Sequence, residues 1–158
     1  MVISVWNRRE WIAASAGAML CLTDAGVAQD APAEYYEMLR WFERRPGSTE
    51  PRVLDGKLVV NHKEEKVAFF AGYTNRFEAP FKKVKSLTYE FAKRPSDLSV
   101  PASDWQKTFK RGERHFLVFE YQDKGGYFKK EILELHKKNW SEVLKALEYA
   151  TGLGVKRI

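Results

Sequence analysis

The sequence predicts a mainly β protein of the α+β class, with an antiparallel curved sheet or small open barrel capped by a C-terminal α-helix. Short runs of β-branched and aromatic residues follow one another from residue 57 to residue 135, and turn residues separate them. A single amphipathic helical pattern comes after the last run. No helical pattern lies between consecutive strands of this region, so parallel βαβ units are not expected.

The first 28 residues indicate an export signal that is not part of the fold. The pair Arg8-Arg9 precedes an apolar run from Trp11 to Leu22, which is too short to span a hydrocarbon core of about 30 Å. The small residues of Gly26-Val27-Ala28 suit a signal peptidase, so we expect cleavage between Ala28 and Gln29. The protein is therefore predicted to be exported, and to be periplasmic or secreted.

The route of export stays open. Arg8-Arg9 followed by Trp11-Ile12 is similar to the twin-arginine motif, although Asn7 stands where Ser or Thr is usual. General secretion is the alternative. An amphipathic or buried N-terminal helix is disfavoured by the stretch from Gly26 to Pro32, and lipidation of Cys21 is disfavoured by the large residues before it.

Composition limits the partners. The chain has 27 basic and 21 acidic residues, for a net charge of +6, and the predicted leader is itself neutral. Cys21 is the single cysteine and lies in the leader, so the mature chain can form no disulfide and must be stabilised by its core. A basic cytosolic protein could bind nucleic acid, but an exported one more often meets anionic lipid or envelope polymers. We expect no nucleic-acid partner, and the oligomeric state stays open.

Residues 29–53 are predicted to form an N-terminal helix and a linker. Four residues recur at the spacing of one helix face, which indicates a helix from Glu34 to Arg45. Its apolar face would consist of Tyr35, Met38, Leu39 and Phe42. Pro46-Gly47 would end this helix, and the polar stretch up to Asp55 has no periodicity. The main domain is therefore expected to span residues 54–158.

Six strands are predicted in this domain. They run from Lys57 to Val60, Lys66 to Phe70, Arg76 to Ala79, Val84 to Lys93, His115 to Tyr121 and Tyr127 to Leu135. The first two and the last two should pair as antiparallel hairpins, and Gly125-Gly126 supplies the positive backbone angles of the second turn. In the fourth strand Leu87, Tyr89 and Phe91 alternate with polar residues, which is typical of a half-buried strand.

The C-terminal region predicts one helix that lies on the sheet. Asn139 is its expected N-cap, with Glu142 three residues on as in a capping box. Gly152 would end the helix. One apolar face would be formed by Trp140, Val143, Leu144, Leu147, Ala150 and Thr151. This face has to be buried, so the helix is expected to cover the sheet.

With this order of elements, the chain resembles the pleckstrin-homology-like (PH/GRAM-like) fold of small exported bacterial proteins. The resemblance rests on Gly56-Lys57-Leu58, on His115 to Tyr121 and on Leu144 to Gly152, and it covers residues 54 to 153. It implies a seventh strand, for which Lys107 to Arg114 is a candidate. Many pleckstrin-homology domains hold inositol phosphates on basic residues after the first strand. The matching stretch here, Asn61 to Lys66, contains two carboxylates, which argues against that ligand.

The long excursion from Pro95 to Gly112 carries the candidate binding residues. Trp105 and Phe109 lie among basic residues, a combination typical of interfacial contacts with anionic membranes. The candidate ligand-binding or lipid-binding residues are Trp105, Lys107, Phe109, Lys110, Arg111 and Arg114. The alternative interpretation is that the two aromatic side chains pack back onto the sheet.

No pattern in the sequence supports catalysis or metal binding. His62, His115 and His136 are far apart in sequence and no cysteine could complete a zinc site, so we expect no metal and no cofactor. His115 begins a strand and His136 ends one, which indicates edge or partnered core residues. The sequence contains no nucleophile elbow, phosphate-binding glycine loop or dinucleotide motif, and we do not expect an enzyme.

Together these observations favour a non-enzymatic binding or scaffold module of the cell envelope, with an envelope protein as its partner. The alternative is a peripheral protein that binds an anionic lipid surface through the basic and aromatic excursion. A small-molecule carrier is the third interpretation. The aromatic residues of the inward-facing strands argue against it, because they predict a filled interior.

Overall fold

The computed structural model describes residues 33–48, 50–96 and 112–158. In chain order their elements are β1 (Glu34–Glu43), β2 (Arg52–Asn61), β3 (Lys66–Ala71), β4 (Thr74–Pro80), the 3₁₀ helix η1 (Phe81–Lys83), β5 (Val84–Ala92), β6 (Arg114–Gln122), β7 (Phe128–Leu135), α3 (Trp140–Thr151) and β8 (Lys156–Arg157). The predicted leader with its cleavage site at Ala28 and Gln29 lies outside the described residues. The same holds for most of the predicted excursion.

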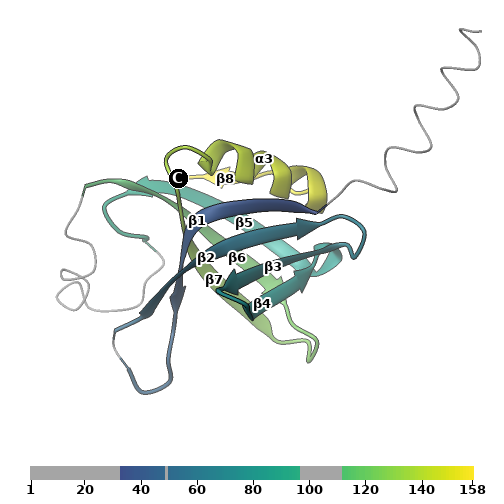
Figure 1. The fold of residues 1–158 in the computed structure, drawn as a ribbon, viewed down its shortest axis with the longest axis horizontal. Helices are drawn as coiled ribbons and strands as arrows, with labels where there is room; N and C mark the ends of the chain where they lie inside the picture. The colour runs from purple at the N-terminus through teal and green to yellow at the C-terminus, as the bar shows by residue number, and fades with distance from the viewer. Residues whose placement is uncertain (1–32, 49, 97–111) are drawn as a thin grey trace, which may run out of the picture. The chain divides into compact units, whose positions relative to one another are not determined.

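The strands form one mixed sheet in the order β4-β3-β2-β1-β7-β6-β5-β8. Neighbouring strands pair antiparallel, except that β5 and β8 are parallel. The sheet curves strongly without closing on itself, and α3 lies across one end of it (Figure 1). The predicted fold class, a curved and mainly antiparallel sheet with a C-terminal capping helix, is confirmed.

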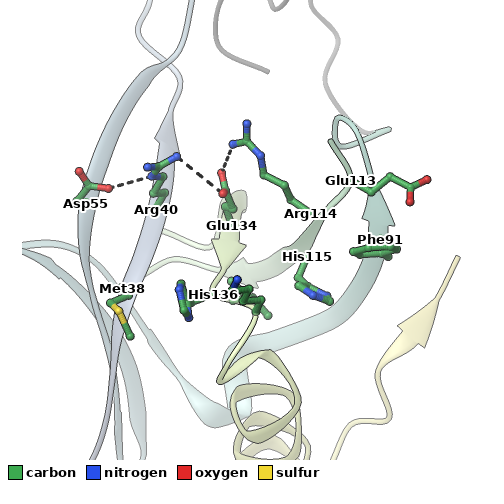
Figure 2. A pocket seen from close by; sticks show the side chains of 11 residues that line it. Met38, Arg40, Asp55, Phe91, Glu113, Arg114, His115, Glu134 and His136 are labelled. Carbon is green, nitrogen blue, oxygen red and sulfur yellow. Dashed lines mark hydrogen bonds and ion pairs between the residues drawn. The ribbon is translucent and has the colours of Figure 1, made fainter. Parts of the chain in front are cut away.

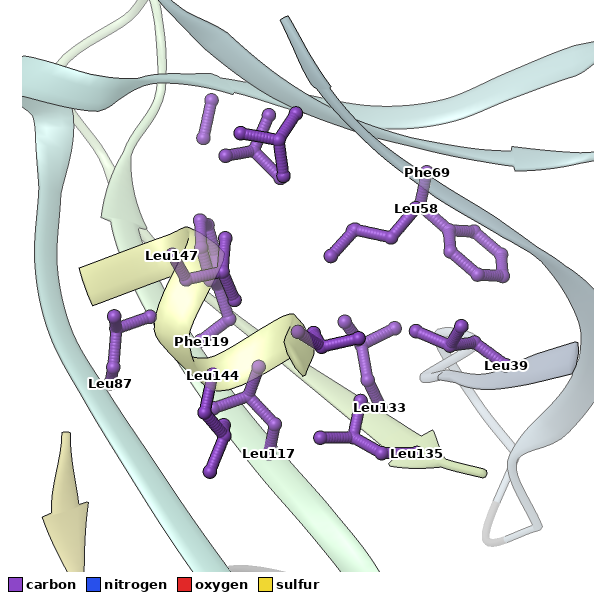
Figure 3. Packing of buried hydrophobic residues seen from close by; sticks show 14 of the residues in the cluster. Leu39, Leu58, Phe69, Leu87, Leu117, Phe119, Leu133, Leu135, Leu144 and Leu147 are labelled. Carbon is purple, nitrogen blue, oxygen red and sulfur yellow. The ribbon is translucent and has the colours of Figure 1, made fainter. Parts of the chain in front are cut away.

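The main core lies between the inner face of the curved sheet and α3 (Figure 3). Leu144 and Leu147 of α3 are buried in one cluster with Phe119 of β6 and with apolar side chains from β1 to β5 and β7. Removal of apolar area from water is the dominant favourable term in folding. Because the chain has a single cysteine and can form no internal disulfide, this cluster is the main source of its stability.

A second buried cluster lies on the outer face of the sheet, formed by Phe42, Phe116, Val118 and Ile132. Adjacent residues of a strand point to opposite faces, and the neighbours of these four along the chain, such as Leu117 and Leu133, belong to the main core. The rings of Phe42 and Phe116 are 6.2 Å apart. The centre of β6 is therefore buried on both faces, which explains its nearly continuous apolar sequence.

The prediction of an N-terminal helix from Glu34 to Arg45 is wrong, because residues Glu34–Glu43 form β1. β1 pairs with β2 on one side and with β7 on the other, so it lies in the middle of the sheet. The predicted linker is also too long, since β2 already begins at Arg52. The domain consequently begins before residue 54, and Ala33–Ile158 form one compact unit.

A β-bulge explains this error. The register of β1 against β2 shifts between Tyr36 and Leu39, where Met38 has a φ of 61°. Tyr36, Leu39 and Trp41 therefore all pack in the main core, at spacings of three and then two residues. The extra residue breaks the period of two that identifies a strand, and the resulting apolar spacing imitates a helix face.

The local predictions for the other strands are largely confirmed. β2 pairs with β3 and β6 pairs with β7 as the two predicted hairpins, and Gly126 in the second turn has a φ of 83°. The predicted third and fourth strands correspond to β4 and β5. Phe91 differs from its expected inward position: it is 49% exposed, because it lies beyond the end of the core and packs against His115.

The terminal helix also has the predicted bounds. α3 follows Asn139 and ends before Gly152, which has a φ of 71°. The predicted capping box is not formed, because the Asn139 side chain makes no capping hydrogen bond. Its Nδ2 instead donates to the backbone oxygen of Glu37 at 2.9 Å, which ties the start of α3 to the bulged part of β1. β8 was not predicted, because a strand of two residues is too short to show the alternation of apolar and polar residues that identifies a strand.

Candidate binding site

Two open pockets lie at opposite ends of β6 and β7. The first, which we call the histidine pocket, has a volume of about 670 Å³ and includes Arg114 and His115 of β6 and Glu134 of β7. The second, which we call the open-end pocket, has a volume of about 510 Å³ and includes Tyr121 of β6 and Glu131 of β7. Both pockets are lined by side chains of both charges.

In the histidine pocket four charged side chains from β1, β2, β6 and β7 form a chain of ion pairs (Figure 2). Nε of Arg40 lies 3.1 Å from a carboxylate oxygen of Asp55, and a second nitrogen of Arg40 lies 3.8 Å from Glu134. Arg114 donates to the other oxygen of Glu134 at 2.9 Å, and both side chains are only 15% exposed. These four charges already have partners within the fold, so they are not available to a charged ligand.

The two histidines of this pocket also have structural partners. Nδ1 of His115 lies 2.7 Å from the hydroxyl of Tyr89, and its ring stacks on Trp140 with centroids 4.8 Å apart. Burial lowers the pKa of His115, which favours the neutral ring. Nδ1 of His136 accepts a hydrogen bond from the backbone N–H of Lys138. Both histidines match the predicted role of partnered residues.

The open-end pocket lies where the core reaches the surface. Its apolar wall consists of Trp41, Phe77 and Tyr121, which belong to the main core. The turns that connect β1 to β2 and β6 to β7 lie on the side of the sheet away from α3 (Figure 1). Four basic side chains and three carboxylates line the pocket: Arg44, Arg76, Lys129, Lys130, Glu43, Asp123 and Glu131.

Glu131 is a half-buried carboxylate that lines this pocket. It accepts a hydrogen bond from Nε1 of Trp41 at 2.7 Å and a longer one from the hydroxyl of Tyr121 at 3.4 Å. Burial raises the pKa of Glu131 and outweighs the opposing effects of the Trp41 hydrogen bond, Lys129 and Arg44. With these two hydrogen bonds, Glu131 holds the indole of β1 and the phenol of β6 together at one carboxylate.

Arg76 is the residue that distinguishes the open-end pocket. Its Nε atom is buried and has no hydrogen-bond partner among the described residues. Arg76 also takes part in none of the ion pairs found in that part of the chain. Buried polar groups of proteins are nearly always paired, so an unpaired guanidinium nitrogen in a pocket requires an explanation.

A second β-bulge places Arg76 in the pocket. Phe69 pairs with Phe77 while Phe70 pairs with Asn75, so Arg76 is the extra residue of β4 and has no partner in β3. In a regular strand it would point away from Phe77, to the outer face. The bulge instead allows Arg76 and Phe77 to line the same pocket. Bulges of this kind often redirect a side chain next to a functional site.

The structure places only one of the predicted binding residues. Arg114 lies in the histidine pocket, where it is paired with Glu134. The other candidates, Trp105, Lys107, Phe109, Lys110 and Arg111, lie outside the described residues. Sequence analysis missed Arg76, Glu131 and Trp41. Arg76 belonged to a predicted strand, but only the bulge gives it a role, and Trp41 belonged to the segment predicted as a helix.

The raised pKa of Glu131 gives the first testable prediction. The folded protein binds a proton at Glu131 more readily than the unfolded chain does, whose carboxyl keeps the usual pKa near 4.5. The contribution of this group to stability is therefore present at low pH and lost as pH rises from 4.5 through the raised pKa. Glu131→Gln has no titrating carboxyl and should not show this loss. The free energy of unfolding of Glu131→Gln minus that of the wild type should therefore be larger at pH 8 than at pH 4.5.

Urea unfolding of both proteins from pH 4.5 to pH 8 measures this difference. The groups around Glu131, namely Glu43, Arg44, Arg76, Tyr121, Asp123 and Lys129, are common to both proteins, so their titration largely cancels. Glutamine keeps an oxygen that can accept the hydrogen bond of Trp41. Identical pH dependences for the wild type and Glu131→Gln would contradict the assignment.

The described residues contain no group of three side chains that could hold a metal ion. No helix within the same residues is long and apolar enough to cross a membrane. No protein-family model matches the chain, and no curated protein sequence matches it either.

Proposed function

We propose that this protein is a non-enzymatic binding module that holds an anionic group in the open-end pocket. The observation that carries this proposal is the buried Nε of Arg76, which has no hydrogen-bond partner among the described residues. Arginine presents several N–H donors in a fixed planar arrangement, which fits carboxylate, phosphate and sulfate oxygens. Arg76 also takes part in no ion pair among the described residues, and a bound anion would supply the opposite charge that its guanidinium lacks there.

The surroundings of Arg76 support an anionic ligand. Arg44, Lys129 and Lys130 line the same pocket, so together with Arg76 the basic side chains outnumber the three carboxylates there. Of the three carboxylates there, Glu131 has a raised pKa and Asp123 accepts hydrogen bonds from its own turn. Asp123 also lies 3.9 Å from Nζ of Lys129, so both of these carboxylates have partners within the fold. The core wall of Trp41 and Tyr121 supplies a rigid support.

We further place this activity in the cell envelope, following the export signal predicted in the first 28 residues. Binding at the surface fits the packing of the domain, because apolar side chains of the sheet and of α3 fill the inner face. A role as a scaffold for an envelope protein is compatible with the same pocket if that protein offers an acidic side chain. A peripheral role through Trp105 and Phe109 remains the alternative proposal.

The test is anion binding by the full chain, followed by intrinsic fluorescence, since Trp41 lies in the pocket. We expect inorganic phosphate and glycerol phosphate to bind, and Arg76→Gln to weaken binding by about 10-fold to 100-fold, because hydrogen bonds to charged groups contribute about 1.5 to 3 kcal/mol. The matched control is Arg94→Gln, which removes an exposed arginine beyond the far end of β5. This variant should bind like the wild type.

A stability measurement separates a ligand-binding role of Arg76 from a structural one. An arginine that holds the fold together would destabilise the protein when removed, whereas an unpaired buried donor costs desolvation energy. We therefore expect Arg76→Gln to unfold at the same urea concentration as the wild type or at a higher one. Equal anion binding by Arg76→Gln and the wild type would overturn the proposal.

A further inference from the structure

We infer that the anionic group held in the open-end pocket is a phospholipid headgroup, and that the turn between β6 and β7 contacts the membrane beside it. This inference rests on the proposed function of Arg76. The segment from Asp123 to Phe128, which we call the hairpin tip, presents two adjacent aromatic side chains to solvent. Tyr127 is 71% exposed and Phe128 is 73% exposed.

The exposure of these aromatic side chains belongs to a well-defined turn. Asp123 Oδ1 accepts hydrogen bonds from the backbone N–H groups of Gly125 and Tyr127, both at 2.9 Å. The Gln122 side chain donates to the backbone oxygen of Gly126 at 2.8 Å. The turn is thus fixed before it meets a partner. Such preorganisation lowers the entropy cost of binding.

The hairpin tip is continuous with the open-end pocket. Asp123 belongs to the tip and also lines the pocket, as does Lys129 immediately after the tip. Nζ of Lys124 lies 3.2 Å from Glu78, two residues beyond Arg76 on β4. A surface that meets the aromatic side chains of the tip would therefore also meet the mouth of the pocket.

The chemistry of this surface fits an anionic bilayer better than a protein partner. Tyrosine and phenylalanine next to lysine are typical of interfacial contacts, where rings enter the headgroup region and cations meet lipid phosphates. Lys124 and Lys129 keep much of their side chains exposed. Basic residues near an anionic membrane strengthen the attachment by attraction to its surface charge. A short apolar contact alone binds weakly, so the pocket would supply the second signal.

Cosedimentation with lipid vesicles tests the inference. The full chain should sediment with phosphatidylcholine vesicles that contain phosphatidylglycerol, and less with pure phosphatidylcholine or at high salt. Tyr127→Ser combined with Phe128→Ser should weaken this binding by about tenfold or more. Tyr149→Ser is the control, because Tyr149 is an equally exposed tyrosine on α3. Every variant carries the same first 32 residues, so differences between variants report on the hairpin tip.

Three outcomes distinguish the inference from the proposed function. Loss of vesicle binding in the double variant, with unchanged binding of soluble glycerol phosphate, supports the inference. Soluble glycerol phosphate binding that depends on Arg76, without vesicle binding that depends on the tip, overturns the inference and leaves the proposed function. Vesicle binding that is insensitive to Arg76→Gln, with no binding of soluble anions, overturns both the proposed function and the assignment of a headgroup to this pocket.

Discussion

Gly56→Ala is expected to lower the free energy of unfolding by about 3 kcal/mol, the upper part of the range for overpacked core sites. A Cβ atom at this position would lie 2.2 Å from the backbone oxygen of Phe70 and 2.6 Å from Cζ of Phe69. The first neighbour is backbone of β3, and the second belongs to a fully buried ring that stacks on Phe77. Neither atom can move without disturbing the core.

Urea unfolding measured by circular dichroism gives this effect directly. The control is Gly154→Ala, since a Cβ there would meet nothing within 4 Å and the residue does not have a positive φ. We expect this control to change stability by no more than about 0.5 kcal/mol. Equal urea midpoints for Gly56→Ala and Gly154→Ala would contradict the close approach of β3 to residue 56.

The Gly56 prediction also explains part of the sequence pattern. Gly56-Lys57-Leu58 is one of the segments on which the resemblance to the pleckstrin-homology-like fold rests. The structure gives a physical reason for its glycine, because the backbone of β3 passes where a side chain would be. This reason holds whether or not the resemblance reflects a common family.

Local signals allowed much of the fold to be predicted from the sequence. The two hairpins combine alternating apolar residues with a turn, and Gly126 adopts the positive φ that its position predicted. Gly152 marks the end of α3 for the same reason. These features depend on neighbours in the chain. β1 could not be recognised, because a single bulged residue at Met38 removes the period of two over its length.

The candidate site was harder to predict, and again a bulge is the cause. Arg76 lies in a predicted strand, where simple alternation would point it away from Phe77. Its position in the pocket depends on the register of β4 against β3, which the sequence of β4 alone does not specify. Glu131 likewise becomes part of a site only through Trp41, which is 90 residues away in the chain. The sequence instead predicted a binding site in the excursion from Pro95 to Gly112, because basic residues that are close together in the chain can be recognised without knowing the fold.

Phe116→Ala should be as destabilising as Phe119→Ala, although the two rings lie on opposite faces of β6. Both side chains are fully buried, Phe119 in the main core and Phe116 in the outer cluster. Replacing a buried phenylalanine by alanine costs about 3 to 5 kcal/mol, because the transfer free energy is lost and a cavity remains. A sheet with one solvated face would tolerate one of the two substitutions.

The measurement is urea unfolding of both variants, with Phe128→Ala as the control. Phe128 is 73% exposed, so its truncation should change stability by no more than about 0.5 kcal/mol. An unfolding midpoint of Phe116→Ala close to that of Phe128→Ala would show that the outer cluster adds nothing to stability.

If Phe116→Ala and Phe119→Ala are destabilised equally, each substitution removes a large share of the roughly 5 to 15 kcal/mol by which small domains are stable. The sheet, without any disulfide, would then depend on apolar packing on both of its faces.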